Sequence, residues 1–385
     1  MSAQELRIGM VGYAFMGAAH SQAWRTVNRV FDLPLRARMV AVAGQHADRV
    51  SAAAHQLGWE ESTTDWRTLV DRPDIDVIDI CTPGDSHAEI ALAALAAGKH
   101  VLCEKPLANS LDEARAMASA AAAADARSMC GYNYRRVPAA ALMREYVTSG
   151  RLGAIRHVRA VYLQDWIVDP AFPLVWRLRK ERSGSGALGD IGSHIVDLTQ
   201  YVTGQSIASV SALTETFVRS RPLPGEAAAG LGGVAATGFG EVTVDDAALF
   251  LARFGGGAVG TFEATRFATG RKNGLRIEIN GEHGSLAFDL ERLNELEYYD
   301  ARLPGPEQGF RRILVTEPGH PYLSAWWPPG HVIGWEHSFT HQARDFIDAV
   351  ATGGELRPSF ADALGVQLVL DAVERSASAG AWTTV

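Results

Sequence analysis

The first third of the chain alternates between two hydrophobic periods. Short apolar runs with the character of buried strands are each followed by a longer stretch with apolar residues at helical spacing. The predicted strands are 6–11, 38–43, 77–81, 100–103 and 128–132, and the predicted helices are 18–30, 47–57, 86–97 and 111–124. Parallel strands need crossover helices, which cover both faces of the sheet. The pattern therefore predicts an α/β, doubly wound parallel sheet over residues 1–131.

The pattern changes after residue 131. The strand candidates become longer and alternate between apolar and polar positions, and several are joined by glycine-containing turns typical of hairpins. They are 156–164, 207–214, 246–254, 258–265, 275–281 and 284–289, with helices at 338–351 and 359–379. We predict a second, α+β domain over 132–385 with an antiparallel sheet, with packing of the last helix on the first domain as an alternative. Residues 220–240 and 303–329 are predicted to form long loops that cover a site or contact another subunit.

Composition narrows the class of protein. The 385 residues suffice for two domains, and 36 basic against 44 acidic side chains give a net charge of −8 without a basic cluster, so no nucleic-acid partner is expected. The longest apolar stretches are too short for a membrane span, and residues 1–7 lack the apolar core of a signal peptide. Cys81, Cys103 and Cys130 are too few and too scattered for a disulfide framework or a metal site. We expect a cytoplasmic protein that does not bind a metal or a membrane.

A glycine-rich turn joins the first predicted strand to the first predicted helix. It has the spacing of the dinucleotide-binding fingerprint, with alanine in place of the middle glycine. Such a turn lets backbone N–H groups approach a pyrophosphate at the helix N-terminus. The alternative is a turn that only connects strand and helix. We predict that the loop binds a nicotinamide dinucleotide through Gly12, Ala14, Phe15, Met16 and Gly17.

The end of the second strand bears on the choice between NAD and NADP. An acidic residue there favours the ribose of NAD and an arginine suits the 2′-phosphate of NADP, but this chain has Gln45 and His46. We expect one of these two side chains to bind the ribose. Asp48 and Arg49 fall in the next helix. NAD is the expected cofactor, with NADP possible.

The segment after the strand 77–81 combines a turn with a helix start. Ligands collect at the carboxyl ends of parallel strands, so Thr82, Pro83 and His87 are expected to line the cofactor groove. Asp85 and Ser86 are suited to cap the following helix, and a purely structural role in capping is the alternative reading.

Two further segments contain groups suited to catalysis. Glu104-Lys105-Pro106 follows the strand 100–103, where a lysine can hydrogen-bond a substrate hydroxyl and stabilise a developing alkoxide. Asp190 and His194 lie four residues apart on a predicted helix, a spacing at which an aspartate can orient an imidazole that acts as a general base. A surface ion pair and a solvated helix pair are the alternatives.

In their order and spacing these motifs resemble the Gfo/Idh/MocA family of oxidoreductases over nearly the whole chain. The resemblance implies a Rossmann domain followed by a domain with a large open, mostly antiparallel sheet that often forms oligomer contacts, here a homodimer or homotetramer. It also implies hydride transfer between a nicotinamide and a secondary alcohol of a sugar. By motif, Lys105 contacts the substrate hydroxyl, His194 is the acid–base group and Asp190 supports the histidine or the substrate. Glu104, Lys105 and Asn133 are also expected at the cofactor.

A narrower resemblance is to family members that oxidise the C3 hydroxyl of glucosides or of anhydrosugars such as levoglucosan. It rests on five segments: 133–136, 162–166, 176–177, 186–191 and 263–266. It implies NAD and a pyranose-like substrate. Aromatic side chains can stack on the apolar face of such a ring and polar ones can bind its hydroxyls. The implied substrate-binding residues are Gln164, Asp165, Trp166, Trp176, Arg177, Asp190 and His194.

Other functions remain open on the sequence. Some relatives are glycosidases that oxidise the sugar transiently with bound NAD, others are inositol or polyol dehydrogenases, and others are non-catalytic regulators that bind NAD. Retention of Lys105, Asp190 and His194 argues against a regulator, because a regulator does not need all three.

Overall fold

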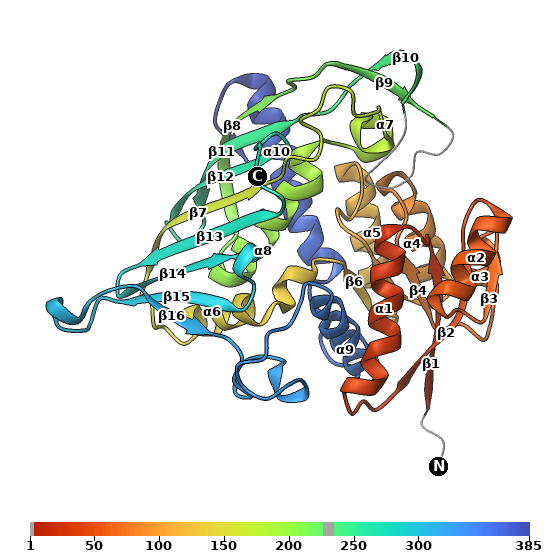
Figure 1. Ribbon diagram of the computed structural model, residues 1–385, viewed down its shortest axis with the longest axis horizontal. Helices are drawn as coiled ribbons and strands as arrows, with labels where there is room; N and C mark the ends of the chain where they lie inside the picture. Colours follow the sequence, from red (N-terminus) through yellow and green to blue (C-terminus); the bar gives the residue numbers. More distant parts are fainter. Residues whose placement is uncertain (1–3, 226–234) are drawn as a thin grey trace. The chain divides into compact units, whose positions relative to one another are not determined.

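The computed structural model describes residues 4–225 and 235–385, which divide into two compact units (Figure 1). The first unit runs to Asn133 and includes Trp335–Gln367. The second comprises Tyr134–Gly334 and Leu368–Val385. A segment from the C-terminal part of the chain therefore belongs to each unit.

The first unit is built on a six-stranded sheet in the order β3-β2-β1-β4-β5-β6, in which every pair is parallel. This confirms the predicted doubly wound sheet. The strands are β1 (Glu5–Val11), β2 (Arg36–Ala43), β3 (Glu61–Thr63), β4 (Val77–Ile80), β5 (His100–Cys103) and β6 (Ser128–Cys130). The helices between them are α1 (Phe15–Val30), α2 (Ala47–Leu57), α3 (Arg67–Asp71), α4 (His87–Ala96) and α5 (Leu111–Ala123).

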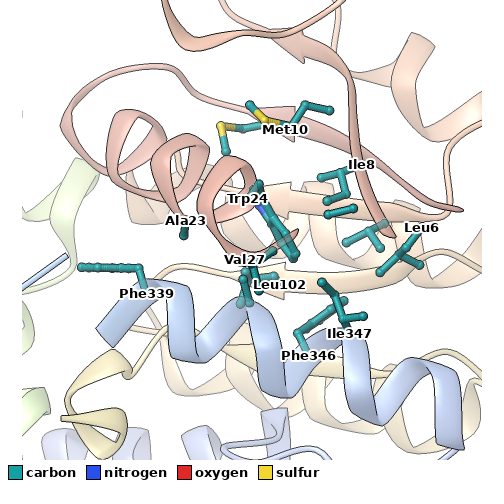
Figure 2. Packing of buried hydrophobic residues seen from close by; sticks show 14 of the residues in the cluster. Leu6, Ile8, Met10, Ala23, Trp24, Val27, Leu102, Phe339, Phe346 and Ile347 are labelled. Carbon is teal, nitrogen blue, oxygen red and sulfur yellow. The ribbon is translucent and has the colours of Figure 1, made fainter. Parts of the chain in front are cut away.

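Helix α9 (His337–Thr352) completes the core of this unit, although it lies more than 200 residues beyond β6 in the sequence. Figure 2 shows Phe339, Phe346 and Ile347 of α9 beside Trp24 and Val27 of α1. The rings of Trp24 and Phe346 meet edge to face with centroids 6.1 Å apart, a favoured aromatic geometry. The C-terminal segment therefore buries the outer face of α1.

The second unit is built on a nine-stranded sheet in the order β16-β15-β14-β13-β7-β12-β11-β8-β17. Only the β7–β12 pair is parallel, which confirms a large, mostly antiparallel sheet. The two predicted hairpins are present as β11–β12 and β13–β14. The strands are β7 (Ile155–Leu163), β8 (Ile207–Glu215), β11 (Ala247–Phe254), β12 (Val259–Thr265), β13 (Gly274–Gly281), β14 (Gly284–Asp289), β15 (Glu295–Asp300), β16 (Arg311–Leu314) and β17 (Thr383–Thr384).

Helices α6 (Pro138–Thr148) and α8 (Ser193–Thr203) pack on one face of this sheet (Figure 1). Along β11 the side chains alternate between buried and exposed, as expected for a sheet covered on one side. The exposed positions include apolar residues on three adjacent strands: Leu213, Leu249, Leu251 and Val259.

The predicted long loops were partly wrong. Residues 220–240 contain a two-stranded ribbon of β9 (Ser220–Pro224) and β10 (Ala235–Glu241), while 226–234 lie outside the described residues. Pro222 and Pro224 favoured the prediction of a loop, because proline is rare inside strands, yet proline is tolerated in edge strands such as these. Residues 303–329 include β16 and two 3₁₀ turns.

The two C-terminal helices are confirmed as α9 and α10 (Phe360–Ala379), and the second unit also has a short helix α7 (Lys180–Ser183). Helix α10 begins in the first unit and ends in the second. Within the described part of the chain, no helix combines the length and apolar character needed to cross a membrane.

Candidate functional site

The turn between β1 and α1 has the shape that a dinucleotide requires. Gly12 has a φ of +101°, and a Cβ there would lie 2.7 Å from the carbonyl oxygen of Cys81. A Cβ on Gly17 would lie 2.2 Å from the oxygen of Gly12, so the helix approaches the turn more closely than any side chain allows. Ala14 is the N-cap and provides no side-chain hydrogen bond to the first turn. The glycine cradle and the uncapped N–H groups fit a bound pyrophosphate.

Phe15 and Met16 make their side-chain contacts with protein. The Phe15 ring stacks on Trp335 with centroids 5.6 Å apart and nearly parallel planes, and Met16 packs against the core of the first unit. Their predicted contribution to cofactor binding therefore rests on the backbone N–H groups of the first helical turn.

Gln45 and His46 are exposed just past the carboxyl end of β2. Their position is the one predicted for a ribose-binding group. His46 is the N-cap of α2 but makes no capping hydrogen bond with its side chain. Gly44 before them is covered by Tyr13, because a Cβ at Gly44 would overlap the tyrosine ring at 2.0 Å.

His87 ties two loops of the sheet edge together. Its Nδ1 lies 3.0 Å from the carbonyl oxygen of Pro106, and its Nε2 lies 2.9 Å from that of Thr82. The loop after β4 is further closed by a hydrogen bond from the Ser86 hydroxyl to the carbonyl of Pro83. The imidazole thus holds the loop of Thr82 and Pro83 against the Glu-Lys-Pro loop, and its direct contact with the cofactor stays a prediction.

Glu104 is buried directly after β5, while Lys105 is half-buried. The Glu104 carboxylate accepts the backbone N–H of Lys105 at Oε2, 3.2 Å away, and its Oε1 lies 3.0 Å from Nε2 of His20. His20 in turn lies 3.0 Å from the carboxylate of Asp79. The sequence analysis missed His20 and Asp79. An aspartate inside the otherwise apolar strand β4 was the available signal.

Asn133 is buried at the start of a 3₁₀ turn (Asn133–Arg136). Its Nδ2 donates to the hydroxyl of Ser338 on α9, 2.8 Å away. This bond links the end of the Rossmann sheet to the C-terminal segment of the same unit. A contact between Asn133 and the cofactor remains a prediction.

In the second unit, Asp190 lies on a π-helical turn (Leu188–Gly192) that leads into α8. Such wide turns are rare and occur frequently at functional sites. The Asp245 carboxylate holds the turn by accepting the backbone N–H groups of Gly186 and Leu188, at 2.7 and 2.8 Å. A Cβ on Gly186 would lie 1.7 Å from the Asp245 carbonyl oxygen, so only glycine fits there.

Asp190 faces a buried cation that the sequence analysis did not assign. The guanidinium of Arg266, which is fully buried, lies 3.6 Å from the Asp190 carboxylate and also donates to the carbonyl of Asp245. Burial lowers the pKa of Arg177, the charge of Asp190 raises it and that of Arg266 lowers it again. Arg177, which is predicted to bind substrate, therefore interacts electrostatically with Asp190. Its guanidinium lies 4.3 Å from the centre of the Trp176 ring.

His194 is buried against two tyrosines. Its ring lies 4.6 Å from that of Tyr134 and 5.9 Å from that of Tyr162, measured between centroids. The two tyrosine hydroxyls are 2.9 Å apart. Burial raises the pKa of Tyr162 well above its ordinary value, so this phenol stays neutral.

A hydrogen-bonded chain connects these tyrosines to predicted substrate-binding residues. The indole N–H of Trp166 donates to Gln164, whose amide N–H donates to Oδ1 of Asn273, and the Tyr162 hydroxyl donates to the same oxygen. Because an indole can only donate, the direction of every bond in the chain is determined. Hydrogen bonds therefore connect Gln164 and Trp166 to Tyr162, and the Tyr162 ring packs against His194.

Asp165, unlike Gln164 and Trp166, is hydrogen-bonded to the connection between β12 and β13. Its carboxylate accepts from Lys272 at 2.8 Å and from the backbone of Gly270 at 3.0 Å, and these two bonds lower its pKa. The side chain is thus engaged with the connection between β12 and β13. Its contact with substrate stays a prediction.

Comparison with known proteins agrees with this arrangement. Residues 6–132 match the family described as "Oxidoreductase family, NAD-binding Rossmann fold", and residues 140–287 match the "GFO/IDH/MocA C-terminal domain". The chain is 43% identical to levoglucosan dehydrogenase of Pseudarthrobacter phenanthrenivorans, over 99% of this chain and 98% of the relative. It is 32% identical to 1,5-anhydro-D-fructose reductase of Ensifer adhaerens, over 64% of this chain and 67% of the relative.

Solved structures show the same similarity. An oxidoreductase domain protein from Kribbella flavida is 60% identical with a TM-score of 0.95, and each chain is covered to 99%. Levoglucosan dehydrogenase in complex with NADH and levoglucosan is 42% identical with a TM-score of 0.93, covering 99% of this chain and 100% of that one. The predicted NAD-binding domain and the predicted family are confirmed. The chain belongs to the Gfo/Idh/MocA family of oxidoreductases.

Proposed function

We propose that this protein is an NAD-dependent dehydrogenase that oxidises a secondary hydroxyl, at C3, of a cyclic sugar: levoglucosan or a related anhydrosugar or glucoside. The observation that carries the proposal is the 43% identity to levoglucosan dehydrogenase over almost the full length of both chains. The glycine cradle at Gly12 and Gly17 supports the cofactor, and the presence of Lys105, Asp190 and His194 supports the chemistry.

Each reactive side chain has a distinct role. His194 accepts the proton that leaves the substrate hydroxyl, with its ring orientation held by Tyr134 and Tyr162. Lys105 donates a hydrogen bond to the oxygen as negative charge develops there. Asp190, paired with Arg266, accepts a hydrogen bond from the substrate or supports His194. Bound NAD supplies the hydride acceptor.

Four residues of the second unit are proposed to bind the sugar ring: Gln164, Trp166, Trp176 and Arg177. Trp166 and Trp176 offer aromatic faces, and Gln164 and Arg177 offer hydrogen-bonding groups. Asp165 is proposed as a weaker contact because Lys272 already occupies its carboxylate. A raised KM for the sugar in Asp165→Ala supports the contact, whereas an unchanged KM assigns Asp165 to the β12–β13 connection alone.

The substrate and the cofactor are tested together by absorbance at the NADH band. Purified protein is mixed with levoglucosan, glucosides, free sugars and inositols, with NAD and NADP in parallel. We expect NADH formation with levoglucosan or a glucoside and a larger kcat/KM with NAD than with NADP. Activity on inositols alone, or a preference for NADP, contradicts the proposal. Cleavage of a glycoside without net NADH would identify the glycosidase alternative instead.

The roles of Lys105 and His194 are tested by Lys105→Ala and His194→Ala. Acid–base assistance of this kind is worth about 10² to 10⁴ in rate, so each variant is expected to lose that much turnover while NADH binding, measured by calorimetry, persists. Lys180→Ala and His283→Ala are matched controls at exposed positions of the second unit. Near-normal turnover in either test variant removes that residue from the mechanism.

We further propose that the first unit binds NAD and that the second binds substrate and forms a homodimer or homotetramer through its open sheet face. The support is the exposed apolar group on β8, β11 and β12, where Leu249 lies directly opposite Leu213. Leu249→Glu combined with Leu251→Glu is expected to reduce the mass measured by light scattering to that of a monomer. We place the protein in the cytoplasm, consistent with the burial of its three cysteines, and cell fractionation tests this.

A further inference from the structure

A buried polar cluster lies beneath the Glu-Lys-Pro loop, entirely within the first unit. It links α1 to the ends of β4 and β5 through His20, Asp79 and Glu104, whose exposed fractions are 2%, 0% and 4%. Nδ1 of His20 lies 3.0 and 3.1 Å from the two oxygens of Asp79, and Nε2 lies 3.0 Å from Oε1 of Glu104. One turn further along α1, the indole N–H of Trp24 donates to Asp79 at 2.7 Å.

The two carboxylates determine the protonation of the cluster. Each ring nitrogen of His20 faces a carboxylate oxygen, so one proton is needed on each side of the ring. Burial lowers the pKa of His20, but the charge of Asp79, its hydrogen bond and the contact with Cys81 together outweigh burial, and the pKa lies well above its ordinary value. Cys81 is 3.6 Å from Asp79, and burial raises the pKa of its thiol so that it stays neutral. From α9 the apolar ring of Phe339 faces His20, with ring centroids 5.5 Å apart.

This cluster is hydrogen-bonded to the backbone at Lys105. Glu104 uses one oxygen for His20 and the other for the N–H of Lys105, so it cannot rotate without breaking one of the two bonds. Gly131 packs against the same carboxylate, since a Cβ there would lie 2.6 Å from Oε1. Buried ion clusters are costly to desolvate and are often no more stabilising than apolar residues of the same size. Stability alone therefore does not account for three buried ionisable groups here.

We propose that His20 is a positioning residue for Lys105, acting through its hydrogen bond to Glu104. The inference rests on the proposed function in that Lys105 is taken to contact the reacting hydroxyl. Nε2 of His20 donates to one oxygen of Glu104 inside the core and keeps the other oxygen aimed at the backbone of Lys105. Asp79, held by Trp24, keeps the imidazole in place from behind.

Two substitutions of His20 separate this role from a general loss of stability. In His20→Asn the amide takes the place of Nδ1 and keeps the contact with Asp79 but loses Glu104. In His20→Gln the amide takes the place of Nε2 and keeps Glu104 but loses Asp79, which retains its bond from Trp24. We expect kcat to fall about tenfold or more in His20→Asn and to stay within a few-fold of the wild type in His20→Gln. NADH affinity and the KM for sugar should change little in both.

A second readout does not depend on activity. The chain has only four lysines, Lys99, Lys105, Lys180 and Lys272, so reductive ¹³C-methylation adds only four lysine signals to that of the N-terminal amine. The Lys105 signal, assigned with Lys105→Arg, should move in His20→Asn and return towards the wild-type position in His20→Gln. The Lys180 and Lys272 signals, both in the second unit, should not move.

Each outcome has one interpretation. If the Lys105 signal and kcat respond equally to both substitutions, or to neither, the positioning role is overturned. If the wild type oxidises no sugar, the proposed function fails, and the Lys105 signal alone decides the positioning role. The positioning role is supported if the melting temperature falls equally in both variants while the Lys105 NMR signal moves only in His20→Asn.

Discussion

Asp245→Ala is expected to release the turn that carries Asp190. The Asp245 carboxylate is the acceptor for the backbone N–H groups of Gly186 and Leu188, at 2.7 and 2.8 Å, just before the π-helical turn. The backbone carbonyl of Asp245 also accepts from Ala187 at 3.0 Å, and this bond survives the substitution. The variant therefore loses two of three anchors, and Asp190 loses part of its fixed position beside Arg266.

The magnitude follows from the two lost bonds. Hydrogen bonds to charged groups contribute roughly 1.5–3 kcal/mol each. Asp245 is half-buried, so the lower end applies and Asp245→Ala should cost about 3 kcal/mol. Asp245→Asn keeps one carbonyl acceptor and should cost about half of that. For a domain of this size 1 kcal/mol corresponds to about 2–4 °C, so the melting temperature of Asp245→Ala should fall by roughly 6–12 °C.

Thermal unfolding and steady-state kinetics measure both consequences. We expect the order wild type, Asp245→Asn, Asp245→Ala in melting temperature, and a loss of kcat/KM in the same order. Asp371→Ala is the control, because its carboxylate pairs with the exposed Arg375, 2.7 Å away, and such surface pairs are worth about 0–1 kcal/mol. If Asp245→Ala unfolds like the wild type with full turnover, the carboxylate does not hold the turn.

Three further predictions concern the first unit. Gly17→Ala should abolish NADH binding in calorimetry because its Cβ would overlap the backbone of Gly12, while Gly305→Ala, in open space, should bind normally. Phe346→Ala should lower the free energy of unfolding by about 3–5 kcal/mol in chemical denaturation, since the ring is fully buried against Trp24. Because the folded pKa of His20 is raised, its stabilisation is complete below about pH 6.5 and is lost as the pH rises through the folded pKa. The melting temperature of the wild type should therefore fall more steeply than that of His20→Asn towards alkaline pH, and parallel curves would contradict this.

Much of the fold could be predicted because its elements leave a periodic signal. The strands of the Rossmann sheet are short apolar runs, and the hairpins of the second unit have glycine-containing turns. The exceptions lack that signal. Strand β3 has three polar or exposed residues at the sheet edge, and β9 contains two prolines. Their pairing is set by tertiary neighbours rather than by their own sequence.

The candidate site also contains residues that the sequence predicts and residues that it does not. Lys105, Asp190 and His194 were found from short motifs. His20, Asp79, Asp245 and Arg266 were not assigned a role, because each acts through a partner far away in sequence: His20 and Glu104 are 84 positions apart, and Asp245 and Gly186 are 59 apart. A lone histidine in a helix or an aspartate in a turn predicts no partner by itself. Asp79, a charged residue in an apolar strand, was the one informative anomaly.

The two segments proposed to carry the chemistry are both held by a carboxylate that accepts backbone N–H groups, but the two carboxylates differ in burial. Lys105 lies in an irregular loop and Asp190 on a π-helical turn, so neither backbone is held by a regular ladder of hydrogen bonds, and in each a carboxylate accepts the N–H groups instead. Asp245 is half-exposed, and water can share its charge. Glu104 is buried, and one of its oxygens is held by the imidazole of His20. Screening by salt acts mainly on charges that solvent reaches. Added salt should therefore weaken the hydrogen bonds that Asp245 accepts from Gly186 and Leu188 and leave those of Glu104 unchanged.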